Sequence, residues 1–502
     1  MGGDLEVIPP LTRFNWLVIA LTSAAVGLAA LTCINGSTVT KDAAQNVRMA
    51  VNLDHQGIVS LDTSAPYRPS MYREPLPIAT SAAAVALADS ILGPAPYTAY
   101  LDGARVEIIK YQNVPWLLLI WATAAATLRL FTKSFYLGLF GGILAVIPFL
   151  STTNVDAVND LYTELPATAL LGLASYLLML AVTGGRAWKS AACGACFGLL
   201  VLTKASFLYV FLGLLAALSL TFFRTPAEWR KCSLRAGLMA ASFALVIVPW
   251  IGRNVHEFGQ ARISERGGLA IYTRALMNQM SREEYRGTFY FWARPAIRPF
   301  IGSLLGFTPA DLGPGGRLAR LNTDPGAEAY QSDLAAELAG RPQDAVSFYR
   351  RGRAERERLE TQFEQSGAPD PDVASDTAMA SAGAAMVKSD LLSDLALTIP
   401  LLWRSAPLIF PTLLLAFGYA LWVRRDALLL YTFPGIAYLS FYALVTPFEP
   451  RPAVITRALA VVAIFTVLHG LGTRVSDLRG PDRRRFSFRR ALPAIAELGR
   501  RR

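Results

Sequence analysis

Long apolar runs recur along this chain of 502 residues and restrict its fold more than any other feature. Residues 14–34, 114–128, 236–249 and 453–471 are examples, and they contain almost no charged side chains. As helices, runs of this length match a hydrocarbon layer about 30 Å thick. Only 17% of the residues are charged, whereas soluble domains carry about 25%. The sequence therefore predicts an all-α polytopic membrane protein.

Basic residues in the short loops predict the orientation of these helices. They flank the apolar runs at 129–133, 186–189, 224–235 and 424–425, and they recur after residue 474. Cytoplasmic loops are enriched in Lys and Arg, so we expect all these segments, and both termini, to be cytoplasmic. This placement explains the net charge of +11 without a nucleic-acid partner. The predicted spans, about ten in number, are 14–34, 114–131, 135–151, 165–183, 189–203, 205–223, 236–252, 405–423, 427–446 and 453–472.

This topology divides the chain into four parts. An N-terminal transmembrane module covers residues 1–252 and includes a first outer loop at 35–113. A polar, mostly helical insertion covers 253–400 and faces outward. The remaining parts are C-terminal transmembrane helices at 401–473 and a basic cytoplasmic tail at 474–502.

Two segments of the first outer loop are too apolar for a solvated loop. Residues 78–92 form an apolar patch and residues 101–111 form an amphipathic stretch. We expect both to be helices that lie on the membrane interface rather than cross it. A short acidic loop at 152–164 faces the same side.

Two acids and three cations on the outer side are candidates for chemistry. Asp42 follows the first span and Glu164 precedes the fourth. A carboxylate so near the bilayer is costly unless it is solvated or paired, which makes each a functional candidate. The alternative for each is a helix-terminal acid that the helix dipole favours. Arg73, Lys204 and Arg253 either bind phosphate oxygens or snorkel to the interface.

Histidine and cysteine predict neither a metal site nor a redox site. The three histidines show no pair at helical metal-ligand spacing. Cys193 and Cys196 form a C-x-x-C within a Gly/Ala-rich run, where close helix packing explains them better. There is no Gly-rich phosphate loop, and the cytoplasmic loops are too short for a nucleotide-binding domain. No cofactor is therefore predicted, and a divalent metal is left open.

Five motifs follow one another on the predicted outer side. In chain order they are Asp42 with Tyr72-Arg73-Glu74-Pro75-Leu76-Pro77, then Leu161-Tyr162-Thr163-Glu164-Leu165, Gly198-Leu199-Leu200-Val201-Leu202-Thr203-Lys204, Pro249-Trp250-Ile251-Gly252-Arg253-Asn254 with Phe258-Gly259, and Glu449-Pro450-Arg451. Together they resemble the GT-C-fold glycosyltransferases that use polyprenyl-phosphate sugars. That group includes protein mannosyltransferases and lipid A aminoarabinose transferases. The resemblance covers about residues 14–472 and is loose within 275–400.

The resemblance implies a GT-C-like bundle and a function. It implies an inverting transferase that moves a hexose or pentose from a polyprenyl-phosphate carrier to a glycan, glycolipid or protein acceptor. Asp42 would be the catalytic base, and Glu164 would be a second catalytic residue that orients the acceptor or binds a metal. The residues implied to bind the donor phosphate or the substrate are Arg73, Lys204, Arg253, Asn254, Glu449 and Arg451. The location implied is a bacterial inner membrane, with the active site facing the periplasm.

Two other functions remain open at this point. A lipid or solute transporter would show two related halves and charges at mid-membrane, whereas the charges here gather near the outer surface. A lipid-linked glycan polymerase or ligase would act on the same side. It would use a longer glycan donor, so the size of its product would distinguish it.

Overall fold

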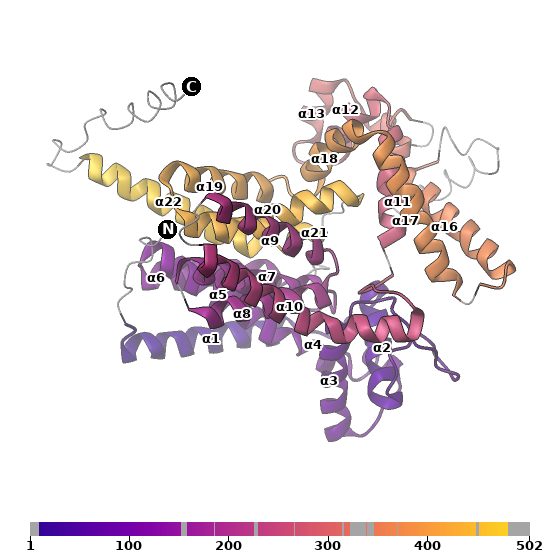
Figure 1. Ribbon diagram of the computed structural model, residues 1–502, viewed down its shortest axis with the longest axis horizontal. Coiled ribbons are helices and arrows are strands. Elements are labelled where there is room, and N and C mark those ends of the chain that lie inside the picture. Colours follow the sequence, from indigo (N-terminus) through magenta and orange to yellow (C-terminus); the bar gives the residue numbers. More distant parts are fainter. Residues whose placement is uncertain are drawn as a thin grey trace.

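The computed structural model consists of helices joined by turns and loops. It describes residues 10–479, apart from 152–157, 185, 225–228, 266, 314–315, 322–337, 339–345, 369 and 448–450. Long helices lie side by side in a bundle, and the insertion occupies one end of it (Figure 1). We call this the insertion end. α1 (Arg13–Cys33) begins, and α22 (Arg457–Arg479) ends, at the opposite end of the bundle.

Seven helices in the described part of the chain are long and apolar enough to cross a membrane. Counting the bent pair α18–α19 as one span raises the number to eight. The seven are α1, α3 (Pro75–Leu92), α4 (Val106–Lys110) joined to α5 (Asn113–Thr132), α7 (Glu164–Thr183), α10 (Trp229–Phe258), α20 (Asp426–Val445) and α22. Large apolar side chains are exposed along α1, for example Leu21 and Leu28, as a lipid-facing helix requires. The chain is therefore an all-helical, multi-pass membrane protein.

Three further predicted spans are apolar helices whose described parts are shorter than the seven helices above. They are α6 (Phe135–Val146), α8 (Ala187–Thr203) and α9 (Phe207–Arg224). α6 gives way to a 3-10 turn that contains Pro148, and α8 ends where Lys204 adopts an extended conformation. α8 and α9 keep close to their predicted limits of 189–203 and 205–223, whereas α6 ends before its predicted limit of 151.

The two segments expected at the interface behave differently from each other. α3 contains residues 78–92 and runs across the direction of the bundle helices, next to α2 (Lys41–Gln56) (Figure 1). Residues 101–111 are not a single interfacial helix, because only α4 is helical and it leads directly into α5. Lys110 is buried and donates from Nζ to the carbonyl oxygens of Asn35, at 2.9 Å, and Ser37, at 2.6 Å. This segment anchors the chain between α1 and α2.

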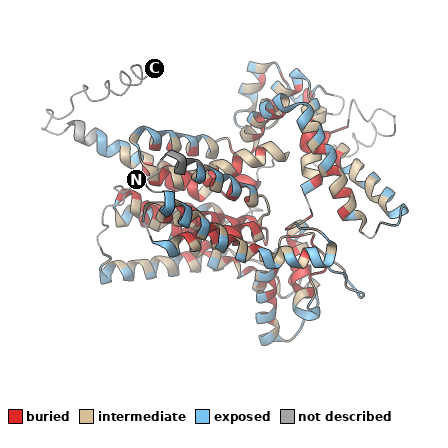
Figure 2. Cartoon of the chain, in the orientation of Figure 1, coloured by how far each residue is buried: buried red, intermediate tan, exposed pale blue. Residues whose placement is uncertain are grey.

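Small residues set the packing of the bundle interior, where buried residues concentrate (Figure 2). A Cβ atom at Gly194 of α8 would lie 2.0 Å from the carbonyl oxygen of Met239 on α10, so these helices pass at close range. Cys193 and Cys196 are buried against α7, and each lies near a backbone carbonyl. The C-x-x-C motif thus occupies a helix–helix contact, as the sequence analysis expected.

The insertion is helical in its described part, and its elements overlap the predicted limits of 253 and 400. α10 continues to Phe258, and α18 begins well before residue 400. Gly268 of α11 approaches Asp376 of α17 so closely that a Cβ would lie 1.9 Å from its carbonyl oxygen. Residues 371–389, which are rich in Ala and Ser, therefore form a packed helix. The helices between the two limits are α11 (Gly267–Leu276), α12 (Arg282–Phe291), α13 (Arg298–Leu305), α16 (Phe348–Gln365), α17 (Pro371–Ser389) and α18 (Leu391–Ser405).

Candidate active site

Asp42 lies in the first turn of α2 and forms an ion pair with Arg73. Its Oδ1 atom is 2.5 Å from Nη2 of Arg73, which precedes α3. The Arg73 side chain is only 6% exposed, and Arg73 also donates to Gln45, one turn further along α2. Arg73 Nε is buried and finds no hydrogen-bond acceptor among the described residues. Asp42 and Gln45 therefore hold the Arg73 guanidinium in place, and its Nε–H remains without an acceptor among the described residues.

Glu164 is the first residue of α7, and its buried carboxylate contacts two cations. Its side chain is 1% exposed. Oε1 lies 3.1 Å from Nζ of Lys204 and 3.1 Å from Nε of Arg451, and Oε2 lies 3.3 Å from Nη2 of Arg451. A carboxylate is tolerated at this depth only because it is paired and hydrogen-bonded.

Arg451 connects the two acids. Its Nη1 atom lies 3.6 Å from Oδ2 of Asp42, and its guanidinium sits 4.0 Å from the ring centre of Tyr162. Burial raises the pKa of Tyr162, so the phenol stays neutral at pH 7. We call Asp42, Arg73, Glu164, Lys204 and Arg451 the charged cluster. The elements that supply it include α2 and α21 (Arg451–Val454), which lie at the insertion end (Figure 1).

The other predicted site residues lie apart from this cluster or outside the described residues. Arg253, near the end of α10, donates to the carbonyl oxygen of Ser70 at 3.1 Å and covers the rings of Trp250 and Phe258. Asn254 is buried and donates to the carbonyl oxygen of Arg262 at 2.7 Å, which ties α10 to the chain that follows it. Glu449 falls within 448–450, outside the described residues.

The structure adds neighbours to the cluster that sequence reasoning did not single out. Gln45 holds Arg73, and the ring centre of Tyr442 lies 5.6 Å from Nζ of Lys204. Tyr438 lies one turn before Tyr442 on α20 and is fully buried. Two sequence features could have indicated these neighbours. One is a Gln three residues after Asp42, and the other is a pair of tyrosines four residues apart in an apolar run, since residues at these spacings share one face of a helix.

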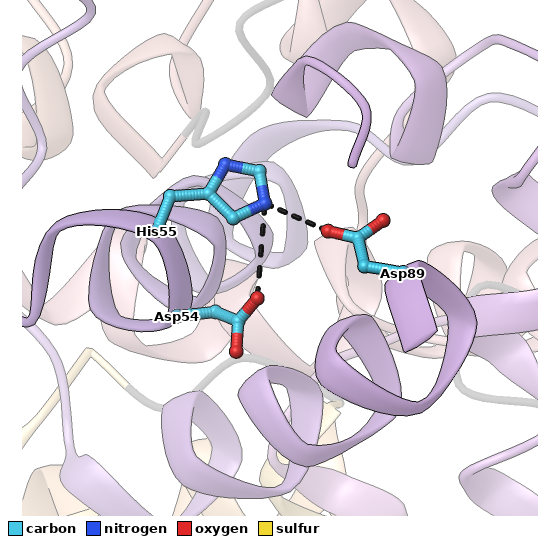
Figure 3. Close-up of side chains that lie close together, drawn as sticks. All are labelled: Asp54, His55 and Asp89. Carbon is cyan, nitrogen blue, oxygen red and sulfur yellow. Dashed lines mark hydrogen bonds and ion pairs between the residues drawn. The ribbon is translucent and has the colours of Figure 1, made fainter. Parts of the chain in front are cut away.

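Among the described residues, one group of side chains lies close enough together to hold a metal ion. It is formed by Asp54, His55 and Asp89 (Figure 3). His55 Nε2 lies 2.7 Å from Asp89 Oδ2 and 3.7 Å from Asp54 Oδ2. The other oxygen of Asp89 binds Tyr100 and the Arg105 guanidinium. Arg105 and His55 already bind the Asp89 carboxylate. We therefore interpret Asp54, His55 and Asp89 as a structural contact that joins the C-terminal ends of α2 and α3. The helical rise places it about 20 Å from Asp42 along α2.

A buried acid in the insertion makes the stability depend on pH. Burial and the nearby Asp370, Asp372 and Asp376 raise the pKa of Glu265 to about 7, against an ordinary value of 4.5, while Arg356 opposes this shift. Between pH 4.5 and 7 the folded state therefore holds a proton that the unfolded state has lost, and stability falls as the pH rises. A shift of this size corresponds to at most about 3 kcal/mol.

Replacing Glu265 with Gln should raise the melting temperature at pH 8 more than at pH 5. Thermal unfolding of the full chain in detergent between these two pH values measures the difference. Glu357→Gln, on the exposed face of α16, is the matched control and should leave the profile unchanged. A parallel upward shift at every pH for Glu265→Gln would contradict the assignment.

Comparisons with known proteins give matches of low sequence identity and low structural similarity. No protein-family model matches the chain, and no curated protein sequence matches it. The ArnT of Cupriavidus metallidurans bound to undecaprenyl phosphate matches with 14% identity over 93% of this chain and 80% of its own, at a TM-score of 0.36. The archaeal oligosaccharyltransferase AglB of Archaeoglobus fulgidus, in complex with an inhibitory peptide and a dolichol-phosphate, matches with 14% identity over 97% of this chain and 54% of its own, at a TM-score of 0.42.

Proposed function

We propose that this chain is an inverting glycosyltransferase that takes a sugar from a polyprenyl-phosphate carrier. The observation that supports this proposal is the charged cluster, which brings two carboxylates and three cations together at one end of a membrane bundle. The acceptor is a glycan, glycolipid or protein, and the sugar is a hexose or pentose. The membrane is a bacterial inner membrane, and the insertion end faces the periplasm.

The reaction requires a base and a way to accept charge on the leaving phosphate. The acceptor oxygen attacks the anomeric carbon, its proton passes to Asp42, and the carbon–oxygen bond to the phosphate breaks with its electrons on the phosphate. A lipid phosphate leaves as a stable anion, so no general acid is needed. Cations fixed beforehand in the site stabilise the charge that develops on it.

The contacts within the cluster support a separate role for each member. Arg73 and Arg451 flank the Asp42 carboxylate, and Arg73 has a spare buried donor for a phosphate oxygen. Glu164 and Lys204 are paired with each other, and Glu164 also fixes Arg451. We propose that Arg73 and Arg451 bind the phosphate, while Glu164 and Lys204 position Arg451.

The four-part division of the chain fits this arrangement. The first outer loop at 35–113 supplies Asp42 and Arg73. The insertion at 253–400 begins at Arg253, which donates to the carbonyl oxygen of Ser70 in the same loop. We propose that this loop and the insertion cover the site from the periplasm. Arg253, Asn254 and Glu449 remain candidate substrate-binding residues in this proposal.

A transfer assay in nanodiscs tests the proposal. The full chain would receive a panel of radiolabelled polyprenyl-phosphate sugars together with a membrane extract as acceptor. We expect transfer from at least one donor, with a mass increase of one sugar on the product and none from nucleotide sugars alone. Transfer of a long glycan would favour a polymerase or ligase. Lipid binding without any transfer would favour a transporter.

A further inference from the structure

Two helices of the insertion expose faces that consist of large apolar side chains. Phe300 and Leu304 of α13 are 72% and 71% exposed, and Leu392 of α18 is 81% exposed. The exposed residues repeat at helical spacing, so each helix has one apolar face. We call them the apolar surface of the insertion, and they are Ile297, Phe300 and Leu304 at α13, with Leu391, Leu392, Leu395 and Ile399 on α18.

The bend between α18 and α19 fixes the orientation of this surface. α18 meets α19 (Ile409–Val423) at 109°, and α19 runs with the bundle (Figure 1). If the bundle crosses the membrane, α18 lies close to the membrane plane. The opposite side of α18 packs on protein through Leu397, Leu401 and the Asp394–Arg274 ion pair. The apolar face of α18 therefore lies at the level where α19 leaves the bilayer.

The three helices α12, α13 and α18 form one unit that extends sideways from the bundle. Trp403 donates from Nε1 to the carbonyl oxygen of Phe289 at 3.1 Å, and Tyr285 donates to that of Ala396 at 3.1 Å. Figure 1 shows α12 and α13 beyond α19, on the outer flank of the bundle at the insertion end. A unit in this position overhangs the lipids that surround α19.

The apolar surface continues into a lipid-facing surface and is accompanied by basic residues. Leu408, just before α19, and Leu415 within it are 62% and 66% exposed. Arg286 of α12 and Arg294, which precedes α13, are exposed, and Lys388 precedes α18. Helices with an apolar face and neighbouring Lys or Arg bind in the headgroup region, where the cations meet anionic lipids.

We infer that α13 and α18 dock the insertion onto the leaflet at the insertion end, with the apolar surface at the boundary between headgroups and acyl chains. The partner is the lipid bilayer itself. This inference rests on the bundle spanning a membrane and is independent of the proposed transfer reaction. Its consequence is that the insertion is fixed relative to the bilayer on one flank of the bundle.

Depth-dependent quenching tests the inference on the full chain in nanodiscs. A fluorophore is attached to Phe300→Cys or Leu395→Cys, in a background where the accessible native cysteines are replaced by Ser. The matched control is Gln362→Cys, on the exposed face of α16 in the same insertion. Lipids that carry a quencher near the headgroup, and iodide in the buffer, are the two probes.

We expect the lipid quencher to quench labels at 300 and 395 several-fold more strongly than a label at 362. Iodide should quench the label at 362 more strongly than the other two. Equal quenching by iodide at all three positions would show that the surface faces water and would overturn the inference. Protection from both quenchers would show that a protein, for example a second copy of the chain, covers the surface, which would also overturn it. Gel filtration of each labelled variant confirms that it is folded.

Discussion

Replacing Asp42 with Asn should lower the rate of sugar transfer by about 10²- to 10⁴-fold, the range that a positioned general base contributes. Asn has nearly the same shape and still accepts a hydrogen bond from Arg73, but it does not take the acceptor's proton. The measurement is the initial rate of transfer in nanodiscs at saturating donor. Binding of the donor should change far less than the rate.

Asp54→Asn is the matched control, because Asp54 lies on the same helix but at the far end from the charged cluster. It should transfer at close to the rate of the unmodified chain, and both variants should elute as single species in detergent. If Asp42→Asn keeps its rate to within a few-fold, Asp42 is only a helix-terminal acid and a counter-ion for Arg73.

Replacing Arg274 with Met should destabilise the protein by about 3–5 kcal/mol, the cost of leaving a buried charge without its partner. Arg274 is completely buried. It donates to the carbonyl oxygens of Ala443, at 3.1 Å, and Asp394, at 2.6 Å, and its Nη1 lies 3.0 Å from Asp394 Oδ1. It thus joins α11 and α18 of the insertion to the end of α20, and its loss should free the insertion from the bundle.

The double variant Arg274→Met with Asp394→Leu separates charge from packing. Buried ion pairs can be replaced by apolar residues of similar volume at little net cost, so the double variant should melt well above Arg274→Met alone. Melting curves in detergent measure both. A double variant as unstable as the single one would show that the hydrogen bonds of Arg274 to backbone carbonyls, rather than the charge of Asp394, determine the loss.

The sequence predicts the bundle well because membrane insertion imposes a local rule. An apolar run must be a helix wherever lipid surrounds it, which is why α1, α7 and α20 begin and end close to their predicted limits. The rule does not indicate where a helix bends. Residues 391–405 form a helix that turns by 109° into α19, and the sequence did not indicate this bend.

The charged cluster could be predicted in part because its members lie in motifs. Asp42, Glu164 and Arg451 meet although up to 409 positions separate them in the chain, and the motif order was the only sign of this. The hydrogen bond from Asn254 to the carbonyl oxygen of Arg262 could not be predicted, because an amide that binds a backbone carbonyl looks the same in a sequence as one that does not. The Arg274–Asp394 ion pair could not be predicted, because neither residue lies in a motif.

The arrangement of Arg451 also has a kinetic consequence. Its guanidinium lies 3.6 Å from Asp42 and 3.1 Å from Glu164, so in the resting protein one cation contacts both carboxylates. In the proposed reaction, an arriving phosphate would compete for the same guanidinium and release the Asp42 carboxylate from it. In the proposed reaction, the empty site would then be inert towards acceptor hydroxyls, and turnover would follow a compulsory order with donor before acceptor.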